Sequence, residues 1–222
     1  MNTFIEPLIL YAVLFFRFFT GPVAPPETPW EFSATAEAAR MVLYTGPSLA
    51  LVWYLMLKVK SLREWGVGRP GIRDAIPALV GLLAISAIGL GMAAAAAAAA
   101  GHFGALPGVP RILPPAGIVP WAILVASVFA GAYLEESFFR FYMLSKRTET
   151  GYGPSGLGPH RAVLVSTVMF AFCHVHLGVW GFANAAISGT VLAYLFLRTR
   201  SLHGVSIAHA IYNVLVFALG PA

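Results

Sequence analysis

The feature that most constrains this chain is a series of long apolar runs separated by short polar loops. A helix that crosses a bilayer needs about 20 largely apolar residues. Seven windows approach this length: residues 4–20, 41–57, 75–100, 117–145, 161–180, 181–197 and 202–219. We therefore predict an all-α fold, a polytopic membrane helix bundle with about seven transmembrane helices. It forms a single transmembrane domain over residues 1–222. The first window holds Glu6 and Arg17, so it either spans the membrane or lies at the interface.

The composition agrees with a membrane protein. Hydrophobic residues make up 59% of the chain and charged residues 10%, whereas soluble domains carry about 25% charged residues. The formal net charge is +5. Its lysines and arginines lie in short loops, which is how membrane topology is encoded, and this argues against a nucleic-acid partner. The expected partner is the lipid bilayer. Cys173 is the one cysteine, so no intrachain disulfide can form.

The loops alternate in charge along the chain. The basic stretches are 58–74 (Lys58, Lys60, Arg63, Arg69, Arg73), 146–161 (Lys146, Arg147, Arg161) and 198–203 (Arg198, Arg200). The stretches between them are poor in basic residues: 21–40 has Glu27, Glu31 and Glu37 against Arg40, and 101–116 has Arg111. Because basic loops stay on the cytoplasmic side, this predicts an integral membrane protein with a cytoplasmic N-terminus. The compact chain favours a bacterial inner membrane.

Six polar residues inside the predicted spans are the candidates for a functional site. They are Glu135, Glu136, Arg140, His174, His209 and Asn213. Depths counted from the cytoplasmic ends, at about 1.5 Å per residue, are roughly 16 Å for Glu135, 20 Å for His174, 14 Å for His209 and 20 Å for Asn213. Three helices thus bring polar groups to one level near the midplane. Ionisable groups at this depth mark a functional site by default.

The two adjacent glutamates are expected to differ in role. Glu136 and Arg140 are spaced i,i+4, so they share a helix face and can form an ion pair. Glu135 is rotated by about 100° from Glu136 and points elsewhere. Arg140 is therefore expected to neutralise Glu136 and leave Glu135 free for general acid–base work. The alternative is that all three side chains form a helix-packing network.

The histidines admit two kinds of chemistry. His209 and Asn213 are also spaced i,i+4 and can present two donors to one oxyanion, or else join two helices. Glu135, His174 and His209 are sufficient ligands for zinc, although no H-E-x-x-H motif is present. Without a metal, Glu135 and His174 would deprotonate a water and His209 with Asn213 would stabilise the oxyanion. Spacing alone leaves both open, and both lead to hydrolysis of an acyl bond.

The ordered motifs resemble a known family. They are E-E-x-x-x-R (Glu135, Glu136, Arg140), F-x-x-x-H (Phe170, His174) and H-x-x-x-N (His209, Asn213). This set, within residues 131–213, resembles the CPBP family, which contains the CAAX prenyl proteases of the Ras-converting type and the bacterial Abi, or bacteriocin-processing, proteins. Family members often have eight spans, and this chain offers seven.

The resemblance implies an intramembrane endopeptidase of the glutamate type. Glu135 and His174 would activate water, and His209 and Asn213 would form the oxyanion hole. The second glutamate and the arginine of the first motif would support them. The resemblance favours no metal cofactor, with zinc as the alternative, and a membrane-anchored or lipidated protein as substrate.

Two other functions compete with this interpretation. Glutamates and histidines also relay protons in proton-coupled transporters, although the inverted repeats typical of those folds are not evident. A non-catalytic membrane binding or immunity protein of the same fold is the second alternative.

Overall fold

The computed structural model of the chain describes residues 4–19, 32–103, 115–149 and 151–219. Regular structure in these ranges is helical, apart from two isolated β-bridges in the loop before residue 159. The predicted all-α fold is therefore confirmed. The acidic residues Glu27 and Glu31 and the basic Arg111, which entered the orientation argument, lie outside the described residues.

Nine α-helices are described. They are α1 (Ile5–Phe15), α2 (Ala34–Arg40), α3 (Gly46–Val59), α4 (Leu62–Trp65), α5 (Ala75–Phe103), α6 (Ile118–Glu136), α7 (Pro159–Phe172), α8 (Gly178–Thr199) and α9 (Leu202–Leu219). Short 3-10 or π-helical segments extend several of them. A π-helical turn, Met41–Thr45, joins α2 to α3, and another, Ser137–Tyr142, continues α6.

Five of the described helical segments are long and apolar enough to cross a membrane. They are Ala34–Val59, Ile72–Ala100, Ile118–Tyr142, Val175–Thr199 and Leu202–Leu219. Five described segments meet this criterion of length and composition, against about seven spans predicted. Two of the seven windows fold as shorter helices: α1 has 11 residues and α7 has 14. The chain is nevertheless a polytopic helical membrane bundle.

The predicted boundary between the windows 161–180 and 181–197 is wrong. Helix α7 ends at Phe172, and a 3-10 turn at Val175–Leu177 leads into α8. The chain turns at Gly178, whose φ of +74° is a conformation that favours glycine. Apolar residues flank this turn on both sides, so hydropathy gives no sign of it.

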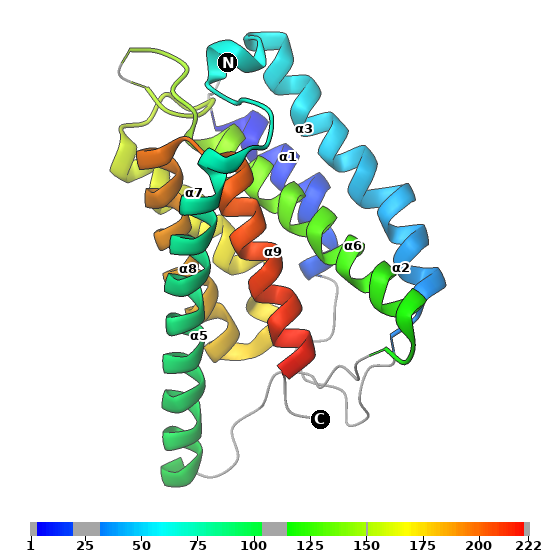
Figure 1. The fold of residues 1–222 in the computed structure, drawn as a ribbon. Coiled ribbons are helices and arrows are strands. Elements are labelled where there is room, and N and C mark those ends of the chain that lie inside the picture. The colour runs from blue at the N-terminus through cyan, green and yellow to red at the C-terminus, as the bar shows by residue number, and fades with distance from the viewer. Residues whose placement is uncertain (1–3, 20–31, 104–114, 150, 220–222) are drawn as a thin grey trace.

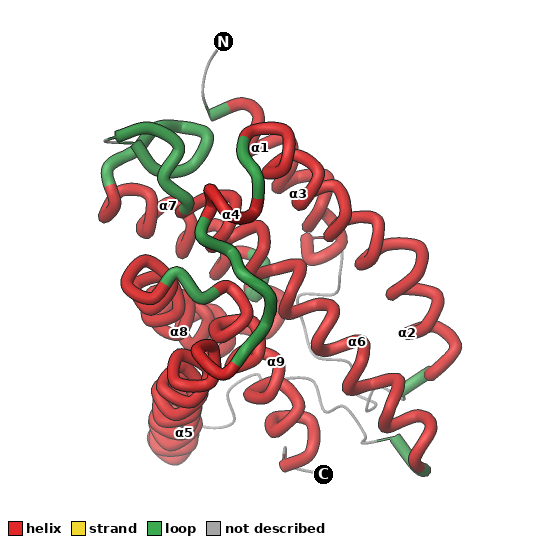
Figure 2. Tube along the Cα trace, turned by 45° about the horizontal axis from the view of Figure 1, so that its top comes forward, coloured by secondary structure: helices red, strands yellow, loops and turns green. Residues whose placement is uncertain are grey.

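The helices pack around a centre formed by α9 and the end of α6. Helix α9 packs against both α5 and α6, while α8 packs against α5 and α7. Helix α2 lies along α6, as Figure 1 shows on the far side of α6 from α9. The connections that carry the basic stretches lie together at one end of the bundle, the end that faces the viewer in Figure 2.

The aromatic run that follows Glu136 forms the core. All six residues of the π-helical turn Ser137–Tyr142 are buried. Phe138 and Phe139 pack against rings of α1, including Phe15, with ring centroids 5.3 and 4.9 Å apart. The Trp53 indole N–H of α3 donates to the Ser137 hydroxyl at 3.0 Å. Packing from α1 and α3 thus fixes the helix end that carries the glutamates. π-Helical turns within α-helices are often found at functional sites.

Candidate active site

The expected ion pair between Glu136 and Arg140 is present. Arg140 Nε lies 3.0 Å from Glu136 Oε2, and neither side chain is exposed. The guanidinium also donates from Nη2 to the Gly189 carbonyl oxygen of α8 at 3.4 Å. It lies over the Phe170 ring, 4.6 Å from its centroid. The pair therefore joins α6, α7 and α8 in the interior of the bundle.

Glu136 has a second partner that the spacing argument did not identify. The His209 Nδ1–H of α9 donates to Glu136 Oε1 at 2.9 Å. The carboxylate of Glu136 is therefore shared between Arg140 and His209. This contact crosses from α6 to α9, so helical spacing within one element gives no sign of it. The agreement in depth between Glu135 and His209 was the available signal.

Glu135 is held quite differently. Its side chain is 17% exposed, against 0% for Glu136, and its Oε2 lies 3.8 Å from His209 Nε2. That distance exceeds hydrogen-bond length. The Glu135 carboxylate makes no direct hydrogen bond to another of the residues that the structure describes. Of the two adjacent carboxylates, Glu136 contacts both Arg140 and His209, and Glu135 has no described partner within hydrogen-bond distance.

His174 lies at the end of α7, where the helix gives way to the turn. Its Nδ1–H donates to the Phe170 carbonyl oxygen at 2.9 Å. Because a carbonyl only accepts, this bond places the proton on Nδ1 and leaves Nε2 with a lone pair. The His174 ring lies 4.6 Å from the Phe170 ring, and the same Phe170 ring lies 5.9 Å from His209. Phe170 is therefore a common neighbour of the two histidines and Arg140.

Close packing at Phe170 depends on Gly189. A Cβ at residue 189 would lie 2.7 Å from Phe170 Cδ1 and 3.7 Å from Arg140 Nη2. Gly189 was not identified from the sequence, because a glycine in an apolar helix carries no chemical signal of its own.

Arg17 is a cation that sequence reasoning did not connect with the site. Its guanidinium lies over the rings of Phe18 and Tyr44, 4.6 and 4.8 Å from their centroids. It also interacts electrostatically with the Glu135 carboxylate. The signal was a charged residue inside the first apolar window.

Asn213 is on the same helix as His209, one turn further along, and is partly buried. Its side-chain amide makes no hydrogen bond to another residue in the part of the chain that the structure describes. The structure thus brings Arg140, His174 and His209 around Phe170, with Glu135 and Glu136 beside His209, while the roles of these residues and of Asn213 stay predictions.

Zinc was the alternative to a metal-free site. Among the described residues, no three His, Cys, Asp or Glu side chains are grouped so as to hold a metal ion. No chemical step below is assigned to a metal, and the absence of a metal cofactor stays a prediction.

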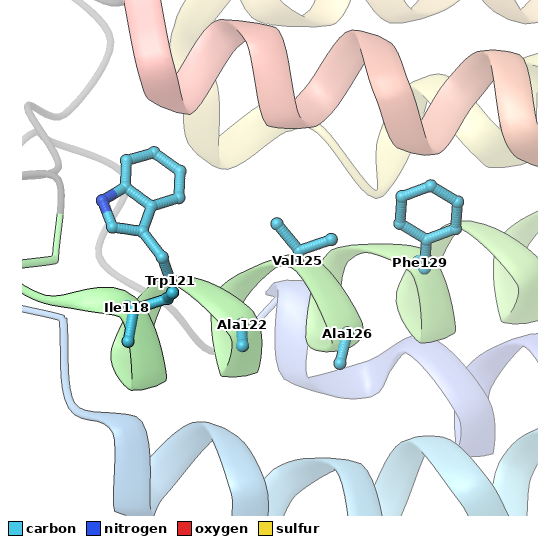
Figure 3. A pocket seen from close by; sticks show the side chains of 6 residues that line it. All are labelled: Ile118, Trp121, Ala122, Val125, Ala126 and Phe129. Atoms are coloured by element: carbon cyan, nitrogen blue, oxygen red, sulfur yellow. The ribbon is translucent and has the colours of Figure 1, made fainter.

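An apolar cavity of about 560 Å³ lies along the first half of α6, away from the glutamates. Figure 3 shows Trp121, Val125 and Phe129 on the side that faces α9, and Ile118, Ala122 and Ala126 on the opposite side. These six residues carry no titratable side chain, so this cavity is separate from the carboxylate–histidine cluster.

The fold and the cluster define a class: a polytopic helical membrane protein with carboxylates and imidazoles gathered inside the bundle. Residues 117–215 match the profile of a family described as type II CAAX prenyl endopeptidase, Rce1-like. The resemblance predicted from the motifs is thus confirmed, and the part of the chain that contains the cluster is similar to a family of membrane proteases. No curated protein and no solved structure matches the chain.

Proposed function

We propose that this protein is an intramembrane endopeptidase of the glutamate type, which hydrolyses a peptide bond in a membrane-anchored or lipidated protein. The family similarity supports protease activity in general. The observation that carries the proposal is the contrast between the two carboxylates. Glu136 is buried between Arg140 and His209, whereas Glu135 is partly exposed and makes no direct hydrogen bond to a described residue.

Glu135 and His174 activate the water. Glu135 takes a proton from the water, and the water oxygen attacks the carbonyl carbon of the scissile bond. The Nε2 lone pair of His174 accepts the second hydrogen of that water and orients it. When the tetrahedral intermediate collapses, the C–N bond breaks and the proton on Glu135 passes to the leaving amine. The geometry that supports this assignment is the Nδ1–H bond of His174 to the Phe170 carbonyl.

His209 stabilises the oxyanion, with Asn213 as the second donor. Since Nδ1–H is held by Glu136, Nε2 donates in the imidazolium form, which a neighbouring carboxylate stabilises. Glu136 and Arg140 therefore act as positioning residues: they orient His209 and keep its charge compensated. No metal cofactor takes part in the proposed reaction.

The proposed location is a bacterial inner membrane with the N-terminus in the cytoplasm. The support is the grouping of the three basic stretches at one end of the bundle (Figure 2). Basic loops are retained on the cytoplasmic side.

The test uses the purified full chain in lipid nanodiscs. Substrates are quenched fluorescent peptides with either an S-farnesyl cysteine, an S-palmitoyl cysteine or an apolar 20-residue anchor. We expect at least one class to be cut, and Glu135→Gln and His174→Ala each to slow cleavage by about 10²–10⁴-fold. Glu149→Gln, a carboxylate-to-amide change on an exposed loop, is the matched control and retains the wild-type rate. Cleavage by Glu135→Gln at the wild-type rate would refute the mechanism.

A further inference from the structure

A second cavity lies at the end of the bundle where the basic stretches gather. It measures about 350 Å³ and lies between the segment that follows α4 and the connection from α8 to α9. Figure 2 looks onto this end: the segment after α4 runs past the α8–α9 connection to the start of α5. None of the proposed catalytic residues lines it.

The cavity lies at the edge of the apolar part of the bundle. Three of the five candidate spans begin or end among its lining residues: Ile72–Ala100, Val175–Thr199 and Leu202–Leu219. The point at which apolar spans end is the level of the lipid headgroups. A ligand in this cavity would therefore lie at the same depth as headgroup phosphates.

The cavity has an excess of positive charge. Arg69, Arg73 and Arg200 line it, with Asp74 as the one acidic residue among its lining side chains. Both oxygens of Asp74 are already engaged, because Oδ1 accepts from the Ser201 hydroxyl at 2.5 Å and Oδ2 accepts from the Gly71 N–H at 2.9 Å. No ion pair between Asp74 and an arginine is present in the part of the chain that the structure describes.

Of the three arginines that line the cavity, Arg69 and Arg73 can bind an anion in it. Arg200 is directed away: its Nη1 donates to the Leu144 carbonyl at 3.5 Å, and its guanidinium lies 5.6 Å from the Tyr152 ring centroid. Arg69 and Arg73 are exposed and make no ion pair with a described carboxylate. The Arg73 guanidinium packs directly over Gly68, where a Cβ would overlap it. This contact places the guanidinium at the wall of the cavity.

His203 is already engaged through both ring nitrogens. Its Nε2–H donates to the Gly68 carbonyl at 3.0 Å, and its Nδ1 is hydrogen-bonded to the Tyr133 hydroxyl at 3.2 Å. The first turns of α5 and α9 also meet at this cavity, through residues 74–77 and 201–203. The N-terminal ends of two long helices add partial positive charge at the same place.

We propose that this cavity binds a phosphate anion at the level of the headgroups, held by Arg69 and Arg73. Guanidinium groups form paired hydrogen bonds with phosphate oxygens. The phosphate is carried either by an anionic membrane lipid, such as phosphatidylglycerol, or by a free anion from the aqueous side. This site is independent of the proposed peptidase activity.

The experiment measures lipid binding to the purified, delipidated full chain in detergent by native mass spectrometry. Phosphatidylglycerol and phosphatidylcholine with the same acyl chains are titrated, and inorganic phosphate is added in a separate arm. We expect phosphatidylglycerol to bind more tightly than phosphatidylcholine. Arg69→Gln and Arg73→Gln should each weaken that binding about fivefold.

Three further variants separate a site from general charge attraction. Arg63→Gln removes one positive charge from α4, outside the cavity lining, and should leave binding within about twofold of wild type. Arg73→Lys keeps the charge but loses the paired geometry, so it should weaken binding less than Arg73→Gln. Gly68→Ala moves the Arg73 guanidinium at unchanged net charge and should also weaken binding.

Two outcomes would overturn the proposal. One is equal weakening by Arg63→Gln and Arg73→Gln, since the attraction would then be general to this end of the bundle. The other is absence of any phosphatidylglycerol preference together with absence of inorganic phosphate binding. If inorganic phosphate alone binds, and Arg73→Gln weakens it, the phosphate site stands and its source is the free anion.

Discussion

Glu136→Gln separates the proposed roles of the two adjacent glutamates. The substitution removes the carboxylate that Arg140 and His209 share and leaves the guanidinium of Arg140 fully buried without its partner. Removal of one partner from a buried ion pair destabilises a protein by about 3–5 kcal/mol. For a chain of this size, each kcal/mol lowers the melting temperature by about 2–4 °C. The expected loss is therefore about 6–20 °C.

Glu135→Gln should behave in the opposite way. This carboxylate is partly exposed and makes no direct hydrogen bond to a described residue. The amide is nearly the same size, so the change in unfolding free energy is expected to stay within about 1 kcal/mol. Glu149→Gln, on an exposed loop, is the control and should fall within about 0.5 kcal/mol of wild type.

The assay follows thermal unfolding of each variant in the same detergent, together with cleavage of whichever peptide class the wild-type protein cuts. Glu136→Gln is expected to lose both stability and activity, and Glu135→Gln to lose activity alone. A double variant with Glu136→Gln and Arg140→Met removes both charges and should recover part of the lost stability. The division of roles is wrong if Glu136→Gln has the same melting temperature as Glu149→Gln. It is also wrong if Glu135→Gln and Glu136→Gln lower the melting temperature equally.

Three further expectations are testable. Gly189→Ala forces a methyl group against Phe170 and should cost about 1–3 kcal/mol in thermal unfolding, whereas Gly91→Ala, where nothing lies within 4 Å, should not destabilise. Asn213→Ala should lower kcat about 10²–10³-fold with little change in KM, and an unchanged kcat removes Asn213 from the oxyanion hole. Cleavage should persist after prolonged dialysis against EDTA and 1,10-phenanthroline, and activity that is lost and then restored by zinc would contradict the metal-free mechanism.

Local spacing within one helix predicted one contact of the site correctly. Glu136 and Arg140 form the ion pair that their i,i+4 spacing predicted. Depth counting was reliable at coarser scale: it placed Glu135 and His209 at one level, and their side chains lie 3.8 Å apart. It could not say which histidine nitrogen meets which carboxylate, because that depends on how α6 and α9 are rotated against each other.

The features that sequence reasoning missed are those without a hydropathy signal. The turn at Gly178 interrupts an apolar stretch, so the windows on either side were divided at the wrong residue. The π-helical turn after Glu136 has the same apolar and aromatic composition as an α-helix would have there. Gly189 matters because of what packs on it from two other helices, which only the three-dimensional arrangement shows.

The adjacency of the two glutamates has a physical reason. Consecutive residues on a helix point about 100° apart, so one helix end presents carboxylates in two directions at the same depth. In one direction, Glu136 meets Arg140 and His209 and forms a compensated, fully buried network. In the other, Glu135 stays partly exposed beside His209 Nε2. Glu136 orients His209 through a hydrogen bond, and His209 lies beside Glu135. One Glu–Glu dipeptide therefore supplies both the group that positions the histidine and the group proposed to react. Exchange of Glu136 and Arg140 for apolar residues should then preserve the fold but leave His209 unoriented, and activity should fall even where stability recovers.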